Sequence, residues 1–199
     1  MPPARRSSHA RSDVFGSSPN TKNRIPTHKR GGTLYDSARV TAAPALVPHE
    51  TLLEPRNESE LFGLFTKVYA VHPELFEFEP LDYNTNRGID IVARNKSDNK
   101  ISESQFWYIE LKYLLRETLD HGFKYLRWII CWEFDKSIGK DTEFAVVQES
   151  DGRSLETSKS SSGRTLYFLN SKTSAVKIQV LRLKEFLKET LGVEFKEEA

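Results

Sequence analysis

Charged residues inside two apolar, strand-like segments constrain this chain more than any other feature. Asp90 lies between Ile89 and Ile91 in the segment IDIVAR, and Glu110 and Lys112 lie in the segment FWYIELKYL. A charged side chain in such a strand costs free energy unless another group compensates it. We therefore expect these positions to form either a structural ion-pair ladder or a functional site.

The alternation of side chains along a β-strand places the charges of the second segment on one face. Glu110 and Lys112 share that face, whereas Ile109 and Leu111 point to the other face and can pack under a helix. If the two segments pair antiparallel, Asp90 comes beside Glu110. Two neighbouring carboxylates repel each other, and Mg²⁺ binds one or two carboxylates together with waters and phosphate oxygens.

A lysine beside such a cation can orient or deprotonate a water molecule, or stabilise charge that develops on a phosphate. The combination of two carboxylates, a divalent cation and a lysine predicts phosphodiester hydrolysis. The alternative is a cross-strand ion pair on a solvated face, which contributes less than about 1 kcal/mol to stability.

The periodicity predicts a mixed α/β or α+β fold with a central sheet flanked by helices. Asn57 is a suitable N-cap for a helix that ends before Pro73. Further elements follow in the order strand, strand, strand, short helix, strand, over 75–83, 89–94, 106–114, 120–128 and 129–134. The remaining chain predicts a strand, a mobile loop, two strands and a helix that Gly192 ends, over 143–148, 149–164, 165–170, 176–183 and 184–191.

Charge divides the chain into two parts. Residues 1–49 contain eight basic and two acidic residues, whereas residues 50–199 have a net charge of −5. We expect a disordered basic leader over 1–49, attracted to polyanions, in front of a folded domain over 50–199. The Arg- and Ser-rich start MPPARRSSHARS also has the composition of organelle transit peptides.

The composition, 38% hydrophobic and 29% charged, is typical of a soluble globular protein. No apolar run approaches the roughly 18 residues of a membrane helix, so we expect no membrane partner. Cys131 is the only cysteine, which excludes an internal disulfide and a cysteine-based metal site. These features favour an intracellular, cytoplasmic protein, or a nuclear or organellar one in a eukaryote.

The order of elements and two motifs resemble the PD-(D/E)XK phosphodiesterase superfamily, which has the restriction-endonuclease-like fold. The motifs are GID at 88–90 and IELK at 109–112, and the resemblance covers about 56–134. It departs from the superfamily pattern at Ile89, where a proline is common. Asp82, in the sequence EPLD, is a rival for the first acid.

The resemblance implies that Asp90 and Glu110 bind Mg²⁺ or Mn²⁺ and that Lys112 assists the attacking water. Many members add a glutamate from the first helix to the metal site. Glu58 is the better candidate for that role, and Glu60 is the alternative.

The segment DHGFKYLRW follows the third strand, where members of the superfamily often place a polar residue toward the scissile phosphate. We expect His121 to act there in catalysis, and Lys124, Tyr125 and Arg127 to contact nucleic acid. Together with the following IICW, the segment is similar to nuclease-like domains appended to large bacterial ATPases. That similarity implies an ATPase or sensor partner.

The sequence therefore predicts a metal-dependent nuclease that hydrolyses DNA phosphodiester bonds, although nothing in it separates DNA from RNA. A homodimer is the common arrangement for nucleases that cut both strands. The alternative function is a non-catalytic restriction-endonuclease-like module that binds nucleic acid or an assembly partner. The acidic balance of residues 50–199 favours that alternative.

Overall fold

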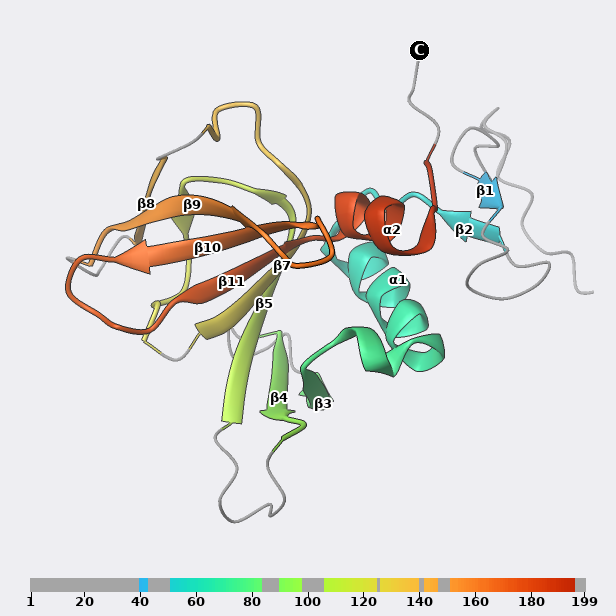
Figure 1. Cartoon of the computed structure of the whole chain (residues 1–199), viewed down its shortest axis with the longest axis horizontal. Coiled ribbons are helices and arrows are strands. Elements are labelled where there is room, and N and C mark those ends of the chain that lie inside the picture. The colour runs from blue at the N-terminus through green and yellow to red at the C-terminus, as the bar shows by residue number, and fades with distance from the viewer. Residues whose placement is uncertain are drawn as a thin grey trace, which may run out of the picture. The chain divides into compact units, whose positions relative to one another are not determined.

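The computed structural model describes seven stretches of the chain, namely 40–42, 51–83, 90–97, 106–124, 126–139, 142–146 and 151–195. Contacts divide the chain into two units, 1–35 and 36–199, and every described residue belongs to the second unit. The leader expected over 1–49 lies outside the described residues except for 40–42. The described fold is mixed α/β, with a nine-stranded sheet and two α-helices (Figure 1).

The nine strands of the main sheet are β3 Phe78–Tyr83, β4 Ile91–Asn95, β5 Phe106–Leu115, β6 Thr118–Leu119, β7 Leu126–Phe134, β8 Glu143–Val146, β9 Arg153–Lys159, β10 Thr165–Ser171 and β11 Ile178–Arg182. The remaining elements are the antiparallel pair β1 Val40–Ala42 and β2 Thr51–Leu53, the helices α1 Glu58–Val71 and α2 Leu183–Leu191, and the 3₁₀ turn η2 Pro73–Leu75.

The strand order in the main sheet is β3-β4-β5-β7-β11-β10-β9-β8-β6. Strands β3, β4 and β5 form an antiparallel meander, and β5, β7 and β11 run parallel. Strands β11, β10, β9 and β8 are again antiparallel neighbours. Figure 1 shows that the sheet is strongly curled, with α1 and α2 together on one side of it.

Because side chains alternate along β7, this strand contributes to both hydrophobic cores of the sheet. Trp128, Ile130 and Trp132 pack in the cluster that contains the apolar faces of α1 and α2. Ile129 and Cys131 point the other way, into a second cluster inside the curled part of the sheet. Burial raises the pKa of the Cys131 thiol, so this cysteine is a packing residue and not a nucleophile.

Both helices begin or end where the sequence predicts. Asn57 caps α1 by accepting a hydrogen bond from the backbone N–H of Glu60, and the helix stops before Pro73. Gly192 ends α2 in the left-handed region, with a φ of 65°. In the described part of the chain, no helix is long and apolar enough to cross a membrane.

The short helix predicted over 120–128 is wrong. Residues 120–124 form a turn and β7 begins at Leu126. In the described part of the connection between the parallel strands β5 and β7, the elements are the two-residue β6 and this turn. Gly122 disfavours a helix here, and a run this short cannot offset the cost of nucleating one. Phe123 is buried in the second core, which holds the turn in place instead.

The mobile loop predicted over 149–164 is also wrong over Arg153–Lys159, which is strand β9. Seven residue pairs join β9 to β10. The strand is hard to recognise because only Arg153 and Leu155 point into the second core, while its other residues are polar and mostly exposed. Pairing with β10, and not a hydrophobic run, determines this strand.

Candidate functional site

The pairing of β4 with β5 brings the two predicted acids together. The strands are antiparallel, and Ile91 is the register partner of Ile109. Asp90 immediately precedes the first of these residues, and Glu110 immediately follows the second. Oδ2 of Asp90 accepts a hydrogen bond of 2.7 Å from the backbone N–H of Leu111. The hairpin pairing expected from the sequence is therefore confirmed.

Glu110 is the buried centre of the cluster, with only 2% of its surface exposed. Its Oε1 lies 2.8 Å from Nζ of Lys112 and 3.0 Å from Nδ1 of His121. Its Oε2 is buried and has no hydrogen-bond partner among the described residues. An unsatisfied oxygen on a buried carboxylate is costly, so this atom is a place where a further cation or donor would be stabilised.

Lys112 lies among three carboxylates. Besides Glu110, Oε1 of Glu58 and Oδ2 of Asp120 each lie 3.7 Å from its ammonium nitrogen. Burial is the largest influence on the pKa of Lys112 and lowers it, but the surrounding acids, Glu110 foremost, outweigh burial and raise the pKa. Lys112 therefore stays charged at neutral pH, which favours orienting water or phosphate over removing a proton.

Burial raises the pKa of Asp90, and repulsion from Glu110 and Glu58 acts in the same direction. The Leu111 N–H and the charge of Lys112 oppose this shift without cancelling it. The ionised form of Asp90 is therefore incompletely compensated by the protein groups around it. A divalent cation would favour that ionised form.

An aromatic pair lies beside these acids. The ring of Tyr83, whose register partner is Ile91, stacks on the ring of Phe62 with centroids 3.5 Å apart. Burial raises the pKa of the Tyr83 hydroxyl, and the charges of Asp90 and Glu58 raise it further. Phe62 follows Glu58 by one helical turn, so α1 contributes both an acid and an aromatic wall to the site.

The rival acids have other roles. The carboxylate of Glu60 accepts a hydrogen bond from the backbone N–H of Arg56 and completes the cap of α1, whereas Glu58 extends to Lys112. Asp82 is exposed on β3 and accepts from the N–H of Tyr83.

The structure describes two of the three residues predicted to contact nucleic acid. Lys124 is exposed in the turn after His121, and Arg127 is half-buried and donates to the backbone carbonyl of Leu126. Tyr125 lies outside the described residues. The structure thus gathers Asp90, Glu110, Lys112, Glu58 and His121 into one cluster.

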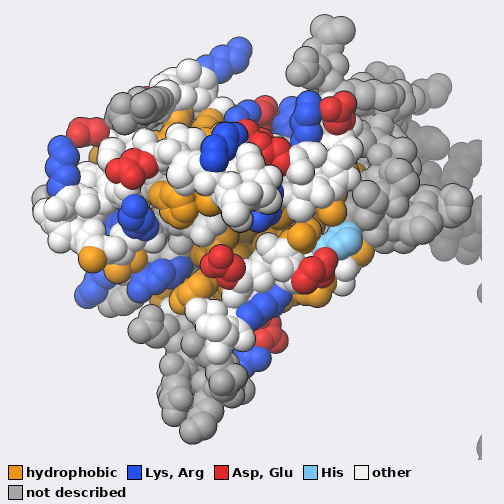
Figure 2. Space-filling view, in the orientation of Figure 1, with side chains coloured by type: hydrophobic (Ala, Val, Ile, Leu, Met, Phe, Trp, Pro, Cys, Tyr) orange, Lys and Arg blue, Asp and Glu red, His pale blue; other side chains and the backbone are white. Residues whose placement is uncertain are grey.

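Asp120 belongs to the cluster but was not among the predicted site residues, because the sequence placed it at the start of a helix. Its carboxylate is 78% exposed and lies in a groove of about 700 Å³ beside Lys112. Four carboxylates and two cationic groups line this groove, namely Glu58, Glu117, Asp120, Asp135, Lys112 and Arg116. On the face in Figure 2, basic and acidic side chains are interspersed, and no extended basic surface is visible.

The donor set fits Mg²⁺ better than a metal that requires a full protein cage. No three His, Cys, Asp or Glu side chains in the described stretches converge as a metal-binding group. Mg²⁺ usually keeps several waters and binds one or two carboxylates together with phosphate oxygens. Asp90 and the unpaired Oε2 of Glu110 match that requirement.

Comparison with protein families, with curated proteins and with solved structures finds no match for this chain.

Proposed function

We propose that this chain is a divalent-metal-dependent nuclease that hydrolyses DNA phosphodiester bonds. The observation that carries the proposal is the buried carboxylate of Glu110, which has one oxygen paired with Lys112 and His121 and the other without a described partner. A buried charge left half-compensated in this way is a common property of functional sites.

The arrangement of elements supports a restriction-endonuclease-like core. Helix α1, the meander β3–β5 and the parallel strand β7 follow the order of the PD-(D/E)XK resemblance. Asp90 directly precedes β4, and Glu110 lies on the adjacent strand β5. The departure is the connection between β5 and β7, where a turn replaces the helix. Although this connection is a turn, His121 lies beside Glu110.

Each residue of the cluster has a distinct role in the proposal. Asp90 and Glu110 would hold Mg²⁺ or Mn²⁺, with Glu58 at the edge of the site. The bound cation would supply Lewis-acid polarisation of a phosphate oxygen. Lys112, kept charged by its acidic neighbours, donates to the scissile phosphate or to the attacking water. His121 orients the carboxylate of Glu110.

The substrate is attracted mainly from outside the acidic groove. The eight basic residues within 1–49 provide a sequence-independent attraction to the phosphate backbone. Lys124, Tyr125 and Arg127 remain predicted phosphate contacts near the turn that carries His121. An ATPase or sensor partner and a homodimer also remain predictions.

The decisive experiment is a cleavage assay with supercoiled and linear single-stranded DNA in Mg²⁺, Mn²⁺ or EDTA. We expect metal-dependent nicking by the wild type, and its loss in Glu110→Gln and in the Glu110→Ala/Lys112→Ala double variant. Asp82→Asn is the matched control, because it removes an exposed acid from the neighbouring strand β3. Equal cleavage by Glu110→Gln and the wild type would overturn the proposal.

A non-catalytic module of the same architecture is the second candidate. The acidic lining of the groove favours it, because without a bound cation those carboxylates repel a phosphate backbone. This candidate predicts that the wild type retains DNA equally in Mg²⁺ and EDTA without cutting it. It also predicts that Mg²⁺ does not raise the melting temperature, whereas a cation bound by the native site does.

A further inference from the structure

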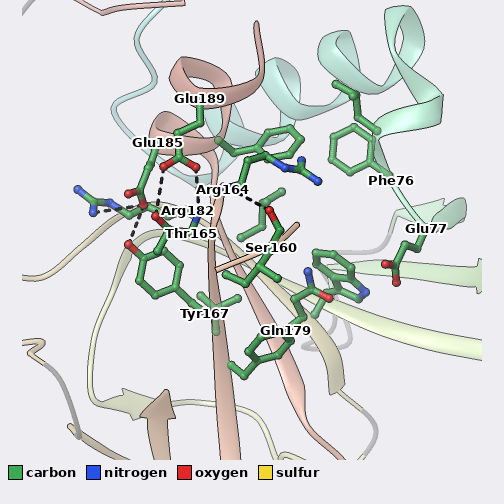
Figure 3. A pocket seen from close by; sticks show the side chains of 17 residues that line it. Phe76, Glu77, Ser160, Arg164, Thr165, Tyr167, Gln179, Arg182, Glu185 and Glu189 are labelled. Carbon is green, nitrogen blue, oxygen red and sulfur yellow. Dashed lines mark hydrogen bonds and ion pairs between the residues drawn. The ribbon is translucent and has the colours of Figure 1, made fainter. Parts of the chain in front are cut away.

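A second cavity, of about 430 Å³, lies between α2, β10, β11 and the residues that follow η2 (Figure 3). It shares no lining residue with the groove beside Lys112. Its volume lies in the range of small-molecule sites, which are mainly apolar and contain a few converging polar groups. The residues that line the cavity indicate which class of ligand it would bind.

The sheet side of the cavity is a row of three register partners. Phe168 on β10 pairs with Gln179 on β11, which pairs with Trp128 on β7, so the three side chains lie side by side on one face. Gln179 therefore lies between the two aromatic side chains on this face. All three side chains line the cavity, so a flat ring bound in it contacts the aromatic groups and the amide together.

The amide of Gln179, between the two aromatic side chains, can form hydrogen bonds with the edge of such a ring. The amide of Gln179 lines the cavity and has no hydrogen-bond partner among the described residues. It offers a donor and an acceptor together, which is the pattern with which glutamine recognises a nucleobase. A purely apolar ligand would leave this amide unpaired.

The wall opposite the sheet offers the positive charge of Arg164, and the residues after η2 add the carboxylate of Glu77. Arg164 lines the cavity, and Figure 3 shows the two glutamates of α2 held by other groups. Glu185 accepts a hydrogen bond of 2.8 Å from the hydroxyl of Tyr167, and Glu189 accepts from Thr165. In the described part of the chain, no carboxylate pairs with the guanidinium of Arg164, which lies over an aromatic ring. Arginine in this state suits a phosphate.

We propose that this cavity binds a nucleotide. The base lies between Trp128 and Phe168 with its edge on Gln179, and the phosphate is bound by Arg164. This inference does not depend on the nuclease proposal, because the cavity and the groove beside Lys112 have separate linings. The same chemistry is offered by a free nucleoside monophosphate and by the terminal nucleotide of a single strand.

Calorimetric titration of the full chain in EDTA tests the proposal without requiring any cleavage. The probes are the four ribonucleoside 5′-monophosphates, adenosine and inorganic phosphate. We expect saturable binding of at least one monophosphate with a Kd below about 1 mM. Arg164→Gln should weaken monophosphate binding about tenfold and leave adenosine binding unchanged. Lys172→Gln, which removes an exposed positive charge outside the cavity, is the matched control.

Gln179→Leu provides a second test at the other end of the ligand. It should alter the preference among the four bases while inorganic phosphate binding stays the same. A 5′-phosphorylated single-stranded oligonucleotide that binds more tightly than its monophosphate would identify a strand end as the ligand, and weaker binding would identify the free nucleotide. Absence of wild-type binding up to about 10 mM, or equal binding by folded Arg164→Gln, would overturn the proposal.

Discussion

The ammonium of Lys112 lies 2.8 Å from Oε1 of Glu110, whereas Oε2 of the same carboxylate has no hydrogen-bond partner in the described stretches. The protein therefore compensates one oxygen of a buried acid and leaves the other to a group from outside. In a structural ion pair Oε2 of Glu110 binds no ligand, whereas in a cation site it binds a metal. Variants of Lys112, Asp90 and His121 distinguish these two cases.

Lys112→Met should destabilise the metal-free protein by about 3 kcal/mol, because it leaves the buried Glu110 without its closest cation. Urea unfolding in EDTA measures this loss. Mg²⁺ should restore part of it if the carboxylates bind the cation. Lys188→Met is the control, because its pair with Glu194 is exposed and contributes less than about 1 kcal/mol. Equal losses in the two variants would contradict the prediction.

Asp90→Asn should raise the melting temperature in EDTA at neutral pH. The pKa of Asp90 is raised in the folded state, chiefly by burial, so its ionisation lowers stability as the pH rises through that pKa. Asparagine keeps an acceptor for the Leu111 N–H and carries no charge. The difference from the wild type should vanish below the ordinary pKa of 3.8, where aspartate is protonated in both states.

Melting curves at several pH values, with and without Mg²⁺, check the behaviour of Asp90→Asn. Mg²⁺ should stabilise the wild type and have little effect on the variant, since one of the two proposed ligands is weakened. A variant that is less stable than the wild type at neutral pH in EDTA would show that the charge of Asp90 is fully compensated by the protein.

His121→Ala should shift the dependence of cleavage on Mg²⁺ to concentrations about 10-fold to 100-fold higher. The imidazole contacts the same oxygen of Glu110 as Lys112, and groups that orient a metal ligand have effects of this size. Lys124→Ala, in the same turn, should instead weaken DNA binding in a salt-dependent way. Titration of Mg²⁺ at fixed DNA measures the first effect, and an unchanged curve for His121→Ala would refute it.

Gly192→Ala should cost about 1 kcal/mol of stability, because φ at this position is 65° and L side chains disfavour that region. A Cβ there meets nothing within 4 Å, so the cost is conformational and not steric. Gly63→Ala is the counterpart inside α1, where a Cβ is also free and alanine should stabilise by about 0.5–1 kcal/mol. Urea unfolding of both variants should therefore give opposite signs.

Local sequence patterns were sufficient to predict much of the site. The cap at Asn57, the helix that follows it and the shared face of Glu110 and Lys112 depend only on nearby residues and on the periods of helices and strands. The place of Asp90 beside Glu110 followed from one assumption, an antiparallel hairpin between two apolar segments. Short-range periodicity was sufficient for these features.

The two wrong predictions, a helix over 120–128 and a loop where β9 lies, have a common cause. The turn at 120–124 and strand β9 both depend on partners distant in sequence: Phe123 is buried in the second core, and β9 pairs with β10. Arg153, buried at the start of β9, places its guanidinium 5.0 Å from the ring centroid of Phe123 and so joins the two misread segments. No window of sequence contains such a contact.

The sequence by itself determined where charge interrupts apolar strands, and hence which acids and which lysine share a surface. Only the tertiary structure decided that Glu58, Asp120 and His121 meet at Lys112 and Glu110. Glu58 comes from α1, Glu110 and Lys112 from β5, and Asp120 and His121 from the turn before β7, so their distances depend on strand register and on how α1 packs against β5. Burial of Glu110 is likewise a property of the packed core, which is why its unpaired oxygen appears only in the folded chain.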